Sequence, residues 1–179
     1  RRQRQMCIRD RYGYDNFEAT EFTTTFTDSI NQKDKSLVRN IKEYLAIRCG
    51  MQEVYTYPWM NDVFVNAVLQ STDGVLKLST PPAPDMSCIR SSLLPNLCEA
   101  VAKNERYFND FSIFEEAQVF FDKNYTNAYD ETESLPEQRR HIGAAFASSV
   151  KDIGMLFREA KGVLEYMPRY THMAVSYTH

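Results

Sequence analysis

The chain has 179 residues, of which 43% are hydrophobic and 25% are charged, and its formal net charge is −3. This composition fits one globular core and excludes a disordered chain. The slightly negative charge argues against a domain whose whole surface follows nucleic acid, so any RNA contact is expected to be local. Apolar runs are only a few residues long, which excludes a transmembrane helix and favours a cytoplasmic protein without a membrane partner.

The two ends of the chain differ in character from the rest. Residues 1–10 and 174–179 resemble translated sequencing-adapter text, so we expect them to be non-native and to make few contacts with the core. A genuine Arg-rich arm that binds polyanions is the alternative for residues 1–10. Residues 11–27 are interpreted as the end of a preceding domain with a Thr-rich linker, and residues 28–173 as the core module.

The first strong helix is predicted over Asp34–Arg48, because apolar side chains recur there at spacings of three and four. Its apolar stripe consists of Leu37, Ile41, Tyr44 and Leu45. Gly50 is expected to end the helix, since glycine readily takes a positive φ just past the last turn. Glu53–Trp59 then predicts a strand, because it is rich in β-branched and aromatic residues and is closed by Pro58.

The middle of the chain predicts further short elements and a second long helix. A helix over Asp62–Leu69 precedes a turn at 72–74 and a strand over Val75–Leu78, and three prolines within 81–84 force an extended connection. The longer helix is predicted over Ser91–Tyr107. Its inward face is expected to consist of Leu94, Leu97, Cys98, Val101 and Ala102.

The longest strand is predicted over Phe111–Phe121, which is mostly apolar on both faces, as a central strand covered on two sides would be. Glu115 and Glu116 interrupt this run. They are either site groups or, as we favour, one paired structural carboxylate and one at the solvent edge, because an unpaired buried charge is costly.

The last third of the chain predicts a hairpin followed by a helix. Residues 124–137 are polar and are expected to form a solvated loop that leads to a strand over His141–Ala147. The final helix is predicted over Ile153–Tyr166. Its inward residues are expected to be Met155, Leu156, Ala160, Val163 and Leu164.

The four cysteines, Cys7, Cys49, Cys88 and Cys98, show no C-x-x-C spacing and lie near no histidine cluster. We expect free, partly buried thiols in a reducing compartment rather than metal ligands, because cysteine packs as a small hydrophobic residue.

Four stretches of the chain, taken in order, resemble one protein family, the phenylalanyl-tRNA synthetase β subunit. Arg11–Asn16 is similar to its RIYGYDN, and Gly50–Tyr57 to its GFQEVITY. Ile89–Phe121 is similar to a helix of the form LRxSLLPxLL…NxxR followed by a strand of the form FxLFEIGRVF. Leu135–Gly143 with Lys161–Glu165 is similar to LPEERRHLAG…DLKGVLE. The four collinear matches are far more specific together than any one of them.

The resemblance implies an α+β fold, with an antiparallel class II aminoacyl-tRNA synthetase-like sheet and flanking helices, here truncated at its C-terminal side. It also implies a heterotetramer of two α and two β subunits in which the α subunit attaches phenylalanine to tRNA(Phe) with ATP and Mg²⁺. The present module would be non-catalytic, would bind no cofactor or metal itself, and would pack against the catalytic α subunit.

A working class II site needs a strand-borne arginine that holds the α-phosphate of ATP. The chain has Ala117 and Gln118 where the family has Gly-Arg, and the Arg90 counterpart is taken as structural in the family. A second arginine would be expected only beyond the end of this chain. No Ser/His/Asp set and no glycine-rich phosphate loop is recognisable either. We therefore predict that the chain does not activate an amino acid.

Two sets of contact residues follow from the resemblance. The basic residues Arg139, Arg140, Lys103 and Arg106 are candidates for tRNA phosphate contacts, and the alternative is solvated charges or ion pairs with Glu137 and Glu105. The candidates for the α-subunit interface are Leu37, Ile41, Tyr44, Leu45, Tyr55 and Tyr57. An apolar stripe cannot by itself distinguish an interface from an internal core, so that alternative stays open. The rival functions are an active class II ligase domain and a stand-alone RNA-binding or interaction module.

Overall fold

The computed structural model describes residues 11–13, 16, 21, 23–25, 32–69, 74–127 and 130–172, with no side-chain description over 123–135. Residues 1–31 and 32–179 form two separate compact units. In the first unit, Gly13 has a positive φ and the Asn16 side-chain amide donates to the Tyr12 carbonyl. The expectations for residues 1–10 and 174–179 lie outside the described residues. All sites discussed below belong to the second unit.

The second unit begins with the predicted helix, which ends in an unexpected way. Helix α2 spans Lys33–Glu43 and continues as a π-helical turn, η2, over Tyr44–Arg48. The Cys49 amide donates to the Tyr44 carbonyl five residues back, which is the wide hydrogen bond of a π turn. Gly50 then takes φ +67°, as predicted, and nothing lies within 4 Å of where its Cβ would be.

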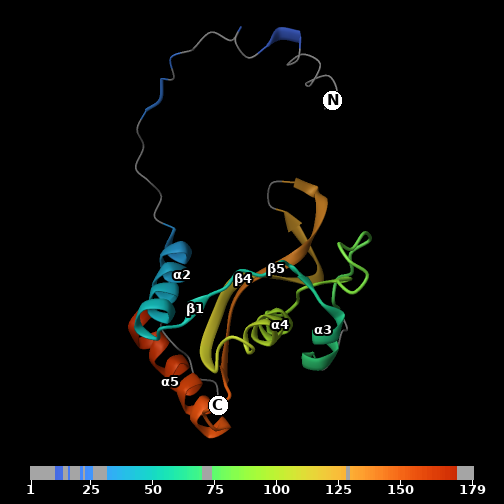
Figure 1. The fold of residues 1–179 in the computed structure, drawn as a ribbon. Coiled ribbons are helices and arrows are strands. Elements are labelled where there is room, and N and C mark those ends of the chain that lie inside the picture. The colour runs from blue at the N-terminus through green and yellow to red at the C-terminus, as the bar shows by residue number, and fades with distance from the viewer. Residues whose placement is uncertain are drawn as a thin grey trace. The chain divides into compact units, whose positions relative to one another are not determined.

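The main sheet has the order β1-β4-β5 (Figure 1). Strand β1 (Gln52–Glu53) runs parallel to β4 (Asp110–Asn127), and β4 pairs antiparallel with β5 (Asp130–Ser148). The sheet is therefore mixed, with an antiparallel hairpin as its main part. The prediction of a loop over 124–137 is wrong for the backbone, because β4 and β5 stay paired through most of this range. A bulge between Phe121 and Asn124 precedes these pairs.

The strand predicted over Glu53–Trp59 is divided between two sheets. After β1 the chain leaves the main sheet, and only its last residues form β2 (Trp59–Met60), which pairs antiparallel with β3 (Cys88–Ile89). The strand expected over Val75–Leu78 is reduced to a single bridge between Lys77 and Cys88. The predicted helix before it is present as α3 (Asp62–Val68), capped by the Asn61 side chain.

Two further helices complete the unit, α4 (Leu94–Asn104) and α5 (Ile153–Thr171). Alternation along β4 and β5 places the helices on opposite faces of the sheet (Figure 1). Phe114 packs with α2, η2 and α5, whereas Ile113 and Val119 pack with α4. Gly143 on β5 lies directly under α4, where an added Cβ would stand 2.8 Å from Leu97 Cδ1.

The inward faces of both long helices differ in part from the predicted stripes. Leu97 is buried as expected, but Leu94 is exposed, and its neighbour Leu93 enters the core instead because α4 meets β5 through Leu93 and Leu97. On α5, Met155 and Leu164 are exposed. The residues of α5 that pack on the first core are Val163, Met167 and Tyr170.

Cys49, Cys88 and Cys98 are free and are buried or half-buried. Among the described residues, no helix is both long enough and apolar enough to cross a membrane.

Candidate functional site

A buried ion pair joins β4, the central strand, to Arg90, which directly follows β3. The Glu115 side chain on β4 is almost fully buried and accepts from Arg90 Nη1 at 3.0 Å. Its two oxygens also accept from the Thr56 backbone amide at 3.0 Å and from the Thr56 hydroxyl at 2.7 Å. Glu115 is therefore a paired structural carboxylate, as the sequence analysis favoured, and every donor that contacts it comes from outside its own strand.

Arg90 is held on all sides by this arrangement. Its Nε donates to the Gln118 carbonyl at 2.8 Å, and its Nη1 lies 3.4 Å from the Thr56 carbonyl. Its own backbone donates to the Pro58 carbonyl and accepts from the Phe120 amide. The guanidinium therefore binds the segment after β3 to the sheet, which agrees with its expected structural role.

The neighbouring carboxylate, Glu116, faces the opposite side of the sheet. It is half-buried and paired, so the expectation that one of the two carboxylates lies at the solvent edge is wrong. It contacts Lys42 Nζ at 3.2 Å and Arg140 Nη1 at 3.2 Å, and Lys42 also contacts Glu53 at 2.6 Å. Partial burial lowers the pKa of Lys42, but the hydrogen bonds to Glu53 and Glu116 outweigh it, so the net pKa is raised. Burial raises the pKa of Glu53, but the hydrogen bonds with Lys42 and Tyr55 outweigh it, so the net pKa is lowered. These charges tie α2, β1, β4 and β5 together.

Gln118 lies on β4 opposite Arg140 of β5, two residues beyond Glu116 on the same face. It is exposed, and it stands at the position where the sequence comparison expects an arginine. The cation across the strand, Arg140, is engaged by Glu116. At this position the chain therefore presents a neutral amide.

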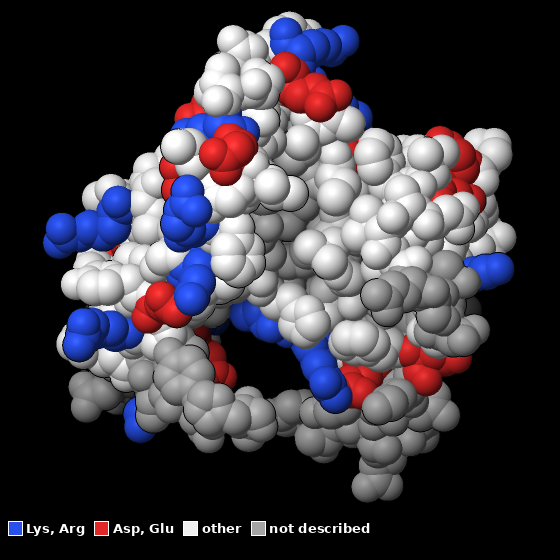
Figure 2. Space-filling view, turned by 90° about the horizontal axis from the view of Figure 1, so that it is seen from below, with Lys and Arg blue, Asp and Glu red and all other residues white. Residues whose placement is uncertain are grey.

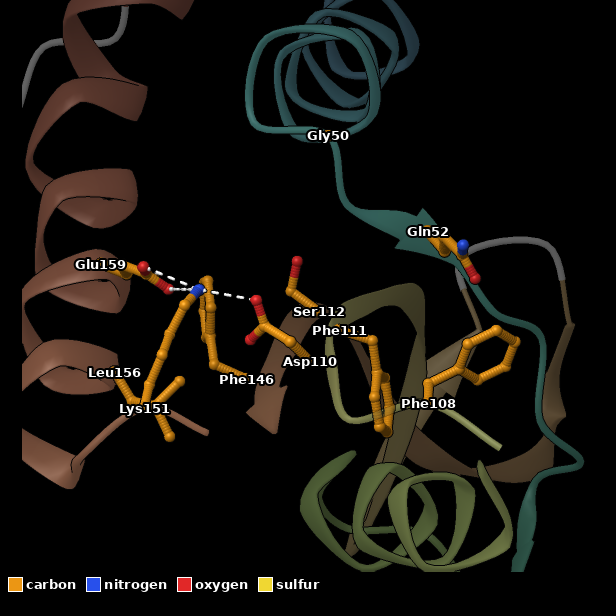
Figure 3. A pocket seen from close by; sticks show the side chains of 10 residues that line it. All are labelled: Gly50, Gln52, Phe108, Asp110, Phe111, Ser112, Phe146, Lys151, Leu156 and Glu159. Carbon is orange, nitrogen blue, oxygen red and sulfur yellow. Dashed lines mark hydrogen bonds and ion pairs between the residues drawn. The ribbon is translucent and has the colours of Figure 1, made fainter. Parts of the chain in front are cut away.

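A cavity of about 290 Å³ lies at the other end of the hairpin, between α5, the segment with Gly50 and Gln52, and the first residues of β4 (Figure 3). Phe108, Phe111, Phe146 and Leu156 supply its apolar walls. On one side Lys151 Nζ lies 2.9 Å from Asp110 Oδ2 and 2.9 Å from Glu159 Oε1. This lysine was not singled out by the sequence, because its two partners are 41 and 8 residues away along the chain and form no motif.

The electrostatics of that cavity favour a structural tie over a reactive amine. The hydrogen bond to Lys151 lowers the pKa of Asp110, and the hydrogen bonds to Glu159 and Asp110 raise the pKa of Lys151. Lys151 therefore stays protonated and cannot act as a nucleophile or base near neutral pH. Among the described residues, no group of three or more His, Cys, Asp or Glu side chains could hold a metal ion.

The structure brings the four predicted tRNA-contact residues to no common site. Arg139 contacts Glu137 at 2.6 Å, one of the ion pairs that the sequence analysis gave as the alternative. Lys103 contacts Glu99 at 2.7 Å rather than Glu105, and the Arg106 guanidinium stacks over the Tyr107 ring. On the face seen in Figure 2, basic and acidic side chains lie interspersed. Contact with tRNA stays a prediction.

The six predicted interface residues fall into two groups. Ile41, Tyr44 and Leu45 are at most 5% exposed and lie inside the core, and Leu37 packs beside them. The internal-core alternative therefore describes this stripe, because α5 and β4 already cover it. Tyr55 and Tyr57 are 77% and 70% exposed, so an interface through these two stays a prediction.

Two polar residues of the site were missed. Thr56 donates twice to Glu115, and the Asn96 side-chain amide donates to the Tyr57 and Trp59 carbonyls at 3.1 Å each. Asn96 shares its helix face with Glu99 and Lys103, so the sequence carries no signal that this amide is buried.

The comparisons with known proteins agree on family and fold. The sequence model of the family described as "Phenylalanyl tRNA synthetase beta chain CLM domain" matches residues 18–179. The Carboxydothermus hydrogenoformans phenylalanine–tRNA ligase beta subunit is 34% identical over 140 residues, which are 73% of this chain and 16% of that protein. The Bacillus licheniformis subunit is 30% identical over 136 residues, which are 75% of this chain and 16% of that one.

Solved structures add the fold. A pyrrolysyl-tRNA synthetase from Desulfitobacterium hafniense superposes with a TM-score of 0.60 at 13% identity, over 79% of this chain and 48% of that chain. A second structure of that enzyme gives a TM-score of 0.53 at 17% identity, over 76% and 45%. The α+β fold with a class II aminoacyl-tRNA synthetase-like sheet is therefore confirmed. Because the family match spans most of its length, the chain belongs to the phenylalanyl-tRNA synthetase beta chain CLM domain family.

Proposed function

We propose that this chain is a non-catalytic module of a phenylalanine–tRNA ligase β subunit. In this proposal the module supports attachment of phenylalanine to tRNA(Phe) by packing against the catalytic α subunit of an α2β2 enzyme. The chain spans about 16% of the length of the two relatives described above, so the activity of the whole enzyme is part of the proposal.

The observation that carries the proposal is the state of Arg90. Activation of an amino acid develops negative charge on phosphorus, and a catalyst meets it with a fixed cation that is free to contact the substrate. Here Arg90 is buried and committed to Glu115 and the Gln118 carbonyl. The strand position that would carry such a cation holds the neutral Gln118. These facts favour a supporting role over catalysis.

ATP and Mg²⁺ are assigned to the rest of the enzyme for the same reason. No group of three or more His, Cys, Asp or Glu side chains that could hold a metal ion occurs among the described residues, and we leave ATP and Mg²⁺ to the rest of the enzyme.

A stand-alone RNA-binding module is less well supported. Such a module needs basic side chains whose charge is available to phosphates, because released counterions supply most of the affinity. Lys103, Arg139 and Arg140 each contact a carboxylate within 3.2 Å. The charge of each pair is therefore largely cancelled before any RNA arrives.

The surface proposed for the α subunit centres on Tyr55 and Tyr57. Both lie on the segment between β1 and β2, where they are exposed although the residues on either side are partly buried. Large exposed aromatic side chains of this kind are enriched at protein interfaces. Tyr57 also stacks on Trp59 with ring centroids 4.6 Å apart, which holds the ring in place before a partner binds.

Association with a purified α subunit from a closely related source tests the proposal. Size-exclusion chromatography with light scattering is expected to show a complex with the parent chain. The double variant Tyr55→Ser/Tyr57→Ser is expected to weaken it at least tenfold, because truncating interface anchors costs about 1.4 kcal/mol or more. Val63→Ser serves as the matched control, since Val63 is 69% exposed but lies on α3. No complex with the parent, or equal weakening by the control, would contradict the proposed interface.

A further inference from the structure

A second cavity, of about 270 Å³, lies between α4 and the segment that links β1 to β2. Tyr55, Tyr57 and Trp59 form its aromatic side, and Val54, Ala100 and Met86 add apolar surface. The α4 side carries Asn96, Glu99, Lys103 and Asn104. Spacings of three and four residues place Asn96, Glu99 and Lys103 on one face of the helix.

Asn96 is the unusual member of this set. The residue is 4% exposed, and both hydrogens of its amide nitrogen are committed to the Tyr57 and Trp59 carbonyls. This fixes the orientation of the side chain, since a flipped amide would point oxygen at oxygen. Among the described residues Asn96 Oδ1 has no hydrogen-bond partner, although it is buried. Through its two donated bonds Asn96 holds the backbone of Tyr57 and Trp59 against α4, which fixes the aromatic side of the cavity.

The charge at the cavity indicates which donor fits. The Glu99 side chain is 17% exposed. Within the described part of the chain its ion-pair partner is Lys103, which is 69% exposed, at 2.7 Å. A planar guanidinium can donate to the Glu99 carboxylate in two parallel bonds and still carry donors for a second acceptor. It also stacks on aromatic rings, which an ammonium does less often.

The neighbouring surface already shows this type of contact. Lys42 Nζ lies 5.5 Å from the centroid of the Tyr55 ring. Tyr57 stacks on Trp59 through one face and is 70% exposed, so its other face is open to solvent. The exposed rings extend beyond the cavity, and a lone small molecule would leave them uncovered.

We infer that this cavity binds the guanidinium of an arginine side chain presented by a polypeptide partner. The guanidinium donates to the Glu99 carboxylate and displaces the Lys103 ammonium from it. The rings of Tyr57 and Trp59 flank the arginine side chain. The cavity shares Tyr55 and Tyr57 with the surface proposed for the α subunit, but the inference rests on the cavity and does not require that the partner is the α subunit.

The cavity contains its own reporter, since Trp59 is the one tryptophan of the chain. We would titrate the full 179-residue chain with N-acetyl-arginine amide, with the neutral isostere N-acetyl-citrulline amide and with N-acetyl-lysine amide, following tryptophan fluorescence. The arginine derivative is expected to give a saturable change with a Kd of about 1 mM, as expected for so small a ligand. Citrulline should give no saturable change, and lysine a weaker one. Equal responses to arginine and citrulline, or no response, would overturn the inference and leave a cavity that holds only water.

Two exposed or half-exposed positions give matched variants. Glu99→Gln keeps the size and removes the charge, so it should weaken arginine binding at least tenfold. Lys103→Met removes the internal competitor and should strengthen it severalfold. Glu165→Gln on α5, across the sheet, is the control and should leave the Kd unchanged. Unchanged affinity in Glu99→Gln would contradict the assignment.

A last arm distinguishes the source of the arginine. Acetyl-Gly-Arg-Gly-amide is expected to bind at least threefold more tightly than N-acetyl-arginine amide, because its backbone reaches the exposed rings. Equal affinity would contradict a polypeptide partner and assign the cavity to a free guanidinium compound.

Discussion

Replacing Arg90 by Met is expected to lower the free energy of unfolding by about 3–5 kcal/mol, because it leaves a buried carboxylate without its cation. The two donations from Thr56 to Glu115 survive and keep the loss toward the lower end of this range. The Gln118 carbonyl loses its donor as well, which adds about 1 kcal/mol. Arg90→Lys keeps the charge but not the fork, and should cost about 1–2 kcal/mol.

The assay is urea unfolding followed by the fluorescence of Trp59. A domain of this size has about 5–15 kcal/mol of stability, so Arg90→Lys remains measurable even if Arg90→Met does not fold. The double variant Arg90→Met/Glu115→Met removes both charges and should be more stable than Arg90→Met alone. A loss below about 1 kcal/mol in Arg90→Met, or a double variant no better than the single one, would refute the role assigned to the pair.

Three further predictions concern packing, pH and the exposed face of α5. Gly143→Ala should lower the free energy of unfolding in urea by about 1–3 kcal/mol, because the new Cβ would stand 2.8 Å from Leu97 Cδ1. The control Gly162→Ala on α5 meets nothing within 4 Å and should raise the free energy of unfolding by up to about 1 kcal/mol. A similar effect at both sites would contradict the packing. The stability difference between the parent and Lys151→Met should be steady from about pH 5 to pH 9. It should close as the pH falls below 3.8, the ordinary pKa of Asp, because the lowered pKa of Asp110 gives stability that is present above that value and lost as the carboxylate protonates. The raised pKa of Lys151 acts in the opposite sense, so the stability that it contributes is present below pH 10.5 and is lost only as the pH rises further. A stability difference between the parent and Lys151→Met that stays the same from pH 2 to pH 7 would contradict the ion pair between Lys151 and Asp110. Phe157 is 66% exposed on α5, and Ile153 and Leu164 of the same helix are exposed as well. Phe157→Glu should therefore raise the monomeric fraction in sedimentation velocity and change the free energy of unfolding by less than about 0.5 kcal/mol. An unchanged monomeric fraction would show that this face does not drive self-association.

The sequence was sufficient for elements that local chemistry determines. The α2 stripe, the positive φ at Gly50 and the central strand were predictable because periodicity, glycine freedom and a continuous apolar run each act within a few residues. The sequence was also sufficient to expect that one of Glu115 and Glu116 is paired, since an unpaired buried charge is not tolerated, but it did not indicate which one or that both are paired.

What the sequence could not supply depends on long-range contacts. The segment from Glu53 to Trp59 has one uniform strand pattern, yet it changes sheets midway, and the bonds from Thr56 in it go to Glu115, 59 residues away. The inward faces of α4 and α5 were partly wrong because an amphipathic pattern fixes an apolar side but not the rotation at which it meets the sheet. Lys151 was missed because its partners meet it only when the hairpin closes.

Phenylalanine-dependent exchange of pyrophosphate into ATP by the chain alone is the most direct measurement of whether this module is catalytic. We predict no exchange above a no-protein control, because Arg90 is committed to Glu115 and Gln118 supplies no cation. The same assay with a matching α2β2 enzyme is the positive control. Exchange above background that follows the purified chain and requires phenylalanine would contradict a non-catalytic module.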